Sequence, residues 1–187
     1  LLDWLATEFL ESGWDVKGMQ RLILTSATYR QASLLSKELE EKDPDNILLA
    51  RGPAVRLPGE LIRDNALFAS VLLNETIGGK SVFPYQPEGL WQVNSATYVQ
   101  GKGENLYRRS LYTIWKRSVH NPTLSLFDAP DHSESISKRQ ETNTPLQALA
   151  LLNDPIFLEA SKVLGEQMAA YPKISEAIQD TFQKLTG

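Results

Sequence analysis

Cysteine is absent from the 187-residue chain, and only two histidines are present, His120 and His132. The lack of cysteine excludes disulfides, a thiol nucleophile, zinc–thiolate sites and haem attachment through cysteine within this chain. Two histidines make a histidine-rich metal site improbable. The sequence also lacks a nucleophile motif, a phosphate-binding loop and a metal signature. We therefore expect no metal site and no cofactor in this segment.

Long apolar runs are missing too, because no stretch reaches the roughly 20 residues that a membrane-spanning helix needs. The net charge of −4 argues against nucleic acid as the main partner, since phosphate neutralisation needs a basic excess. The N-terminus carries no capping residue and no initiating methionine, although Leu1–Leu5 already has a helical pattern. We expect residues 1–187 to form a single helical domain excised from a larger multi-domain protein.

Hydrophobic spacing predicts a mainly α fold, an irregular orthogonal array of about six helices with a long ordered loop region. The expected helices cover residues 1–12, 15–28, 58–74, a segment beginning at 145, 155–170 and 174–187. We expect Gly13 to end the first helix and Asp15 to cap the second. Arg63 and Asp64 of the third helix are expected to find structural partners near the buried surface. Residues 47–49 are expected to anchor the chain on the core.

Residues 80–107 are rich in aromatic residues and proline, which predicts irregular backbone there. We also expect one small β-hairpin that pairs residues 97–99 with 111–115. Both faces of the second strand are apolar, so we expect it to be covered on both sides.

The stretch 127–155, FDAPDHSESISKRQETNTPLQALALLNDP, combines a charged loop with two helix starts. Thr144 precedes a proline, and Gln147 follows three positions later, which is the pattern of a capping box. Asp154 and Pro155 repeat the order of cap and then proline. Leu146, Leu149 and Leu152 are expected to form the apolar side of the first of these helices.

Four strings carry a family resemblance: LLDWLA (1–6), FLESGWDVKGMQRLILTSATYRQAS (9–33), LYRRSLYTIWKR (106–117) and the stretch 127–155. Together they resemble the planctomycete-type domain of unknown function that follows cytochrome-c-like domains in large exported bacterial proteins. The resemblance extends over nearly the whole chain.

This resemblance implies an exported location, periplasmic or at the cell surface. It also implies partners in the parent protein, namely neighbouring domains that include a c-type haem domain. It supplies no catalytic residue, because the family has no accepted activity.

Positive charge near the two helix starts makes this region a candidate anion-binding site. The candidate binding residues are Arg108, Arg109, Lys138, Arg139, Asn143 and Thr144. Helix N-termini bind phosphate, sulfate or carboxylate, and arginine adds bidentate contacts, so an anionic glycan would suit the site. In the alternative interpretation, the caps occupy the free N–H groups and the arginines pair with nearby acids such as Asp128.

Three other interpretations stay open. Asp128, Asp131, His132 and Glu134 offer oxygen and nitrogen ligands for a cation, but without a calcium-loop spacing. Paired carboxylates of the same loop would suit a hydrolase. Aromatic rings, such as those of Tyr85, Trp91, Tyr98, Tyr107 and Tyr112, either stack on sugars or fill the core.

The sequence favours a non-catalytic binding or scaffolding module of an exported multi-domain protein, in contact with an extracellular polysaccharide or a neighbouring haem domain. The alternative is a hydrolase domain that acts on polysaccharide. Three structural outcomes would separate them. A cleft lined by several carboxylates would favour the enzyme, a flat aromatic or basic surface would favour binding, and internally paired charges would favour scaffolding.

Overall fold

Helices dominate the computed structural model, which describes residues 1–92 and 97–186. The described part contains eight α-helices and only isolated β-bridges, so the mainly α prediction is confirmed. The chain divides into two compact units, Leu1–Val55 (unit 1) and Arg56–Gly187 (unit 2). Residues 93–96, within the predicted irregular segment, and Gly187, the predicted last helical residue, lie outside the described residues. The prediction of a single excised domain stays a prediction.

Unit 1 consists of α1 (Leu2–Glu11), α2 (Val16–Thr25) and α3 (Lys37–Lys42). The predicted break at Gly13 is present, with the glycine in the left-handed region at φ 72°. Asp15 caps α2 as predicted, because its carboxylate accepts a hydrogen bond from the Gly18 N–H at 2.9 Å. No helix of unit 1 buries a side chain.

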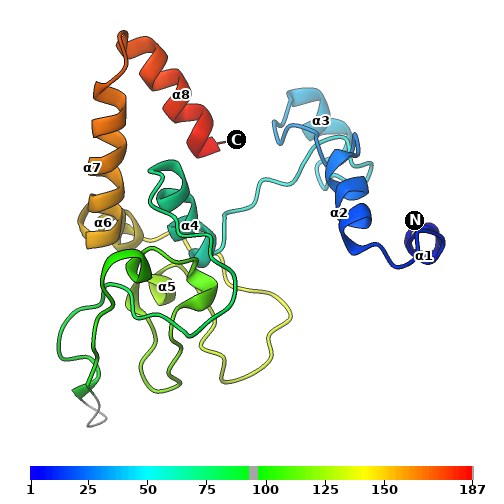
Figure 1. Ribbon diagram of the computed structural model, residues 1–187. Coiled ribbons are helices and arrows are strands. Elements are labelled where there is room, and N and C mark those ends of the chain that lie inside the picture. Colours follow the sequence, from blue (N-terminus) through cyan, green and yellow to red (C-terminus); the bar gives the residue numbers. More distant parts are fainter. Residues whose placement is uncertain (93–96, 187) are drawn as a thin grey trace. The chain divides into compact units, whose positions relative to one another are not determined.

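Unit 2 is built around α4 (Gly59–Ala69), which packs against α5 (Pro122–Leu126), α7 (Pro155–Ala169) and α8 (Ile174–Thr186). α6 (Pro145–Asn153) joins the base of α7, and α8 turns back from the far end of α7 towards α4 (Figure 1). Buried side chains of α4, of the end of α5 and of α7 form the core, namely Leu67, Phe127, Ile156 and Phe157.

The helix predicted over 58–74 is shorter than expected, since Pro58 is its N-cap and Ala69 its last residue. Val71 adopts a left-handed backbone at φ 62°, which α-helical hydrogen bonding cannot continue through. At the other end, Gly59 lies so close to α5 that an added Cβ would stand 2.9 Å from the Cβ of Phe127. Glycine at this position therefore permits the close approach of α4 and α5.

The predicted β-hairpin is not confirmed. Residues 97–99 form no strand, and Ser110–Tyr112 is a 3₁₀ helix, η3. The physical reason is a polar contact with α4: the Asp64 carboxylate accepts hydrogen bonds from the N–H of Ser110 at 2.8 Å and from its hydroxyl at 2.7 Å. These bonds hold the backbone in a turn, and Leu111, which the strand prediction expected to be covered, is 81% exposed.

Both predicted helix starts in the stretch 127–155 are confirmed. Thr144 caps α6 and forms the complete capping box with Gln147. Asp154 caps α7 by accepting a hydrogen bond from the Ile156 N–H at 3.1 Å. Proline occupies the first position of each helix. A backbone N–H at that position has no acceptor within the helix, so its absence in proline costs no hydrogen bond.

Candidate functional site

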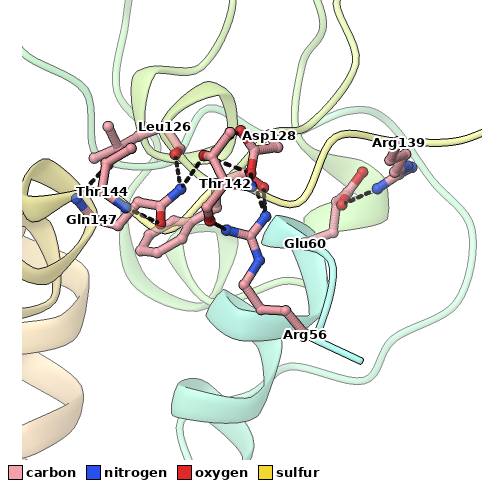
Figure 2. A network of polar contacts seen from close by, with 9 residues as sticks. Arg56, Glu60, Leu126, Asp128, Arg139, Thr142, Thr144 and Gln147 are labelled. Carbon is pink, nitrogen blue, oxygen red and sulfur yellow. Dashed lines mark hydrogen bonds and ion pairs between the residues drawn. The ribbon is translucent and has the colours of Figure 1, made fainter. Parts of the chain in front are cut away.

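The charged loop is held by a set of polar contacts centred on Asp128, which we call the Asp128 network (Figure 2). It comprises Arg56, Asp128, Thr142 and Gln147. The Asp128 carboxylate pairs with the Arg56 guanidinium and accepts hydrogen bonds from the Thr142 N–H at 2.8 Å and from the Thr142 hydroxyl at 2.9 Å. Arg56 also donates to the Thr142 carbonyl. One carboxylate thereby joins three chain segments.

Burial raises the pKa of Asp128, but the hydrogen bonds from Thr142 and the contacts with Arg56 outweigh it. The net result is a pKa below the ordinary value of an aspartate. The side chain is only 12% exposed, so its charge has limited access to water. Asp128 is therefore ionised at neutral pH, and its negative charge is already compensated within the protein.

Gln147 connects the Asp128 network to α6. Its side-chain amide donates to the Leu126 carbonyl at 2.9 Å and to the Thr142 hydroxyl at 3.0 Å, and its oxygen accepts from the Thr144 N–H at 3.2 Å. The residue is buried, with 5% of its surface exposed. The capping box thus does more than start α6, because the same glutamine fixes the end of α5 and the charged loop (Figure 2).

A second ion pair joins the loop to α4, since Arg139 donates to the Glu60 carboxylate at 2.7 Å. Burial raises the pKa of Glu60, yet the hydrogen bond from Arg139 contributes to a net pKa below the usual range of a glutamate. The pair is partly open to solvent, with 40% of the arginine side chain exposed. Its contribution to stability is correspondingly small.

Arg108 lies within the folded chain rather than at a binding surface. It is 6% exposed and donates to the carbonyls of Thr76 at 2.8 Å, Gly78 at 2.5 Å and Lys80 at 3.2 Å. Its guanidinium carbon lies 3.9 Å from the centre of the Tyr112 ring. These contacts make Arg108 a structural anchor for residues 76–80.

The six predicted binding residues do not share one set of contacts. Thr144 takes part in the capping box of α6, and Arg139 forms an ion pair with Glu60. Arg109, Lys138 and Asn143 are exposed. Within residues 1–92 and 97–186, no hydrogen bond joins Arg108 or Arg109 to the other four. The proposed anion site stays a prediction, and Thr144 caps α6, as the alternative interpretation described.

Arg56 was not identified from the sequence, although it is central to the network. It stands 72 positions before Asp128, and no motif surrounds it. Thr142 is only 14 positions from Asp128, but no motif links the two residues, so it was missed as well. The usable signal in the sequence was the high density of acidic and hydroxyl side chains in the loop. Such side chains need hydrogen-bond partners when they are buried, but the sequence does not show which residues supply them.

The aromatic residues mostly contact one another or a fixed partner. The rings of Phe83, Trp91 and Tyr98 form a cluster with centroid separations between 5.2 and 6.1 Å. Burial raises the pKa of Tyr98 to about 12. The hydroxyls of Tyr85 and Tyr107 both donate to the Glu159 carboxylate, at 3.0 and 2.7 Å. These contacts favour packing over a flat sugar-stacking surface.

α6 buries its polar residue and exposes its leucines, the reverse of the expected pattern. Gln147 is its buried residue, whereas Leu146 is 61%, Leu149 56% and Leu152 70% exposed. The three leucines were predicted to form the apolar side of this helix, and that side is exposed instead of buried. The hydrogen bonds of Gln147 set the rotation of the helix and turn the leucines outward.

A groove of about 510 Å³ runs along α6, and we call it the α6 groove. Leu146, Leu149 and Ala150 line one side, and residues 85–87 line another. A volume of this size lies in the range of ligand sites, roughly 300–1,000 Å³.

Within the described residues, no group of three or more histidine or acidic side chains is placed to hold a metal ion. The four residues of the candidate cation site do not form such a group. No helix in the same part of the chain is both long and apolar enough to cross a bilayer.

Comparisons with curated proteins and with solved structures gave no match. The family model described as "PSD1: Protein of unknown function (DUF1553)" matches residues 1–187. Because this match extends over the whole sequence, the chain belongs to the PSD1 (DUF1553) family of proteins of unknown function.

Proposed function

We propose that this domain is a non-catalytic binding or scaffolding module of an exported bacterial multi-domain protein. It would position an extracellular polysaccharide or brace a neighbouring domain, such as a haem domain. The proposal rests on one observation: two ion pairs tie the charged loop to α4 and to the segment just before it. Arg56 pairs with Asp128 and Arg139 with Glu60, so these charges hold the backbone in place.

A hydrolytic site would need a different arrangement. Paired catalytic carboxylates face a shared cleft, and at least one has a raised pKa so that it can act as an acid. Here the pKa of both Asp128 and Glu60 is lowered. The α6 groove is lined by one carboxylate, that of Asp154, which accepts hydrogen bonds from the Thr123 hydroxyl and the Ile156 N–H. The ion pairs and hydrogen bonds of Asp128, Glu60 and Asp154 therefore support a structural role for these carboxylates.

The test exposes the purified chain to an array of neutral, uronic-acid and sulfated polysaccharides, and assays the same polymers for release of reducing ends. Binding without release is the expected result. Release of reducing ends would identify the hydrolase alternative instead.

The double variant Arg109→Ala, Arg139→Ala tests anion recognition, and the double variant Lys37→Ala, Lys42→Ala in unit 1 is a matched loss of two exposed positive charges. Anion recognition predicts that only the double variant of Arg109 and Arg139 loses binding to sulfated polymers. If no polymer binds, the polysaccharide part of the proposal is wrong. Calorimetric titration with the separately expressed neighbouring domains of the parent protein then tests the bracing role, which absence of binding would contradict.

A further inference from the structure

We propose that one water molecule is bound in a small polar cavity of unit 2, where it joins Arg63 of α4 to Asn121 and Asp154, the caps of α5 and α7. The cavity has a volume of about 10 Å³, and we call it the Arg63 niche. A buried water needs roughly 10–15 Å³ and two to four polar partners. The polar side chains that line the niche are those of Arg63, Tyr85, Asn121, Thr123 and Asp154. This inference goes beyond the proposed function, because it concerns how the interior of unit 2 is held together.

The first support is a set of donors that the Arg63 guanidinium has left over. Arg63 is only 3% exposed. Among the described residues, it donates three hydrogen bonds, to the carbonyls of Leu106 and Arg108 and to the Ser110 hydroxyl. An arginine side chain carries five N–H donors, so two remain for other acceptors. Since a buried donor without an acceptor is destabilising, these two favour an acceptor in the niche.

The second support is the side-chain amide of Asn121, which is 6% exposed. Its oxygen accepts a hydrogen bond from the Leu124 N–H at 3.1 Å as the cap of α5, whereas its nitrogen has no acceptor among the described residues. This nitrogen and the Arg63 Nε, unlike the side-chain nitrogen of Gln86, are not among the unpaired side-chain atoms that are closed off from water. A molecule the size of water can therefore reach both donors.

The third support is the separation between Arg63 and Asp154. Burial lowers the pKa of Arg63, and the carboxylates of Asp64 and Asp154 act against this effect. Asp64 Oδ1 lies 3.5 Å from Arg63 Nη1, whereas within residues 1–92 and 97–186 no direct ion pair joins Arg63 to Asp154. A bridging water connects polar groups at such a separation. Each Asp154 oxygen accepts one hydrogen bond, from the Ile156 N–H or the Thr123 hydroxyl, and can accept another.

Size and charge select water among small ligands. An organic molecule does not fit into about 10 Å³. A metal cation would lie against the positive charge of Arg63, and a halide would lie against the negative charge of Asp154. Water is neutral, and it can accept hydrogen bonds from Arg63 and Asn121 while it donates one to Asp154. It therefore satisfies the donors and the acceptor together.

The experiment uses the full chain in solution. Relaxation dispersion of ¹⁷O in the solvent counts the water molecules that stay bound longer than the protein tumbles, and water–amide NOE spectra of the ¹⁵N-labelled chain locate them. We expect NOE cross-peaks from water to the Asn121 side-chain amide and to the Arg63 Nε–H, with the sign of a bound water. Absence of both cross-peaks would overturn the proposal.

Tyr85→Phe and Thr123→Val are the controls for hydroxyl protons, which exchange with water and imitate such cross-peaks. Both substitutions keep the shape of the side chain and leave Arg63, Asn121 and Asp154 in place. The cross-peaks should persist in both variants. Loss of the cross-peaks in either variant would assign them to that hydroxyl and overturn the proposal.

Asn121→Leu removes both amide donors at similar volume and should lower the count of long-lived waters by about one. Asn105→Leu is the matched substitution at an exposed asparagine outside the niche, and it should leave the count unchanged. An unchanged count in Asn121→Leu, or an equal loss in both variants, would contradict the assignment. The wild-type cross-peaks decide the question even if Asn121→Leu unfolds, because they require no substitution.

Discussion

The two units of this chain have similar local structure but very different interiors. In unit 1, α2 and α3 begin at side-chain caps, Asp15 and Ser36, yet no helix of the unit buries a side chain. In unit 2, α5, α6 and α7 begin at side-chain caps of the same kind. The buried hydrophobic residues among the described residues also lie in unit 2, from Leu67 to Ala177. Capping determines where a helix starts, whereas buried contacts between distant segments determine how firmly it is held.

The same contrast appears in the polar contacts. Asp43 of unit 1 accepts hydrogen bonds from the N–H groups of Ile47 and Leu48, four and five positions away. Asp128 of unit 2 pairs with Arg56, 72 positions away. Local bonds fix a turn, and long-range bonds hold separate elements together. The predictions below test this difference, in order of decreasing effect.

The largest effect is expected from Arg63→Met. Arg63 is only 3% exposed, and its guanidinium donates to the carbonyls of Leu106 at 2.7 Å and Arg108 at 2.9 Å. Methionine leaves those acceptors and Asp64 without their partner, so the free energy of unfolding should fall by about 3 kcal/mol. Urea unfolding followed by circular dichroism measures it. Arg21→Met, on exposed α2, should change little; equal effects of the two variants would remove the distinction between the units.

Asp128→Asn should lower the free energy of unfolding by about 2 kcal/mol at pH 7, because it removes a charge-assisted pair. The folded-state pKa of Asp128 is lowered, so its stabilisation is fully present above the unfolded-state pKa and is lost as pH falls through the folded value. The difference between wild type and variant should therefore shrink below about pH 4. Urea unfolding across pH measures this. Asp45→Asn, at an exposed site, is the control, and a difference that grows in acid would contradict the account.

Gly59→Ala should cost about 1–2 kcal/mol, because the added methyl group meets the Cβ of Phe127 at 2.9 Å and forces α4 away from α5. Gly165→Ala is the matched control on α7, where nothing lies within 4 Å of the added Cβ. There the better helix propensity of alanine should stabilise by about 0.5–1 kcal/mol. Thermal unfolding of both variants measures the two shifts, and shifts of the same sign would contradict the close contact.

The smallest effect on the whole chain is expected from Asp15→Ala in unit 1. It removes the cap of α2, worth about 1 kcal/mol to that helix alone. Amide exchange should accelerate at Gly18 and its neighbours while amides of α7 keep their rates. A matching acceleration in α7 would show that unit 1 and unit 2 open together.

Sequence reasoning predicted features that depend on neighbouring residues. The caps at Asp15, Thr144 and Asp154 follow from side-chain chemistry within three positions, and all three are confirmed. It also predicted that Arg63 and Asp64 would find structural partners near the buried surface, although it could not name them.

It failed where distant contacts override local pattern. The run 111–115 resembles a strand, but Asp64 holds its start as a turn. The leucines of α6 have the spacing of a packed side, but Gln147 rotates them outward. Ile47 and Leu48 were expected to pack on the core, yet they are 79% and 77% exposed, because Asp43 fixes their backbone.

Native-state amide hydrogen exchange, resolved by residue, tests the central claim most directly. The account predicts that the Thr142 N–H, which donates to Asp128, and the amides of α7 are protected to a similar and high degree, whereas amides of α2 and α3 exchange through local opening. Rapid exchange at Thr142, at the rate of an unprotected loop, would contradict the conclusion that the Asp128 network holds the charged segment in place.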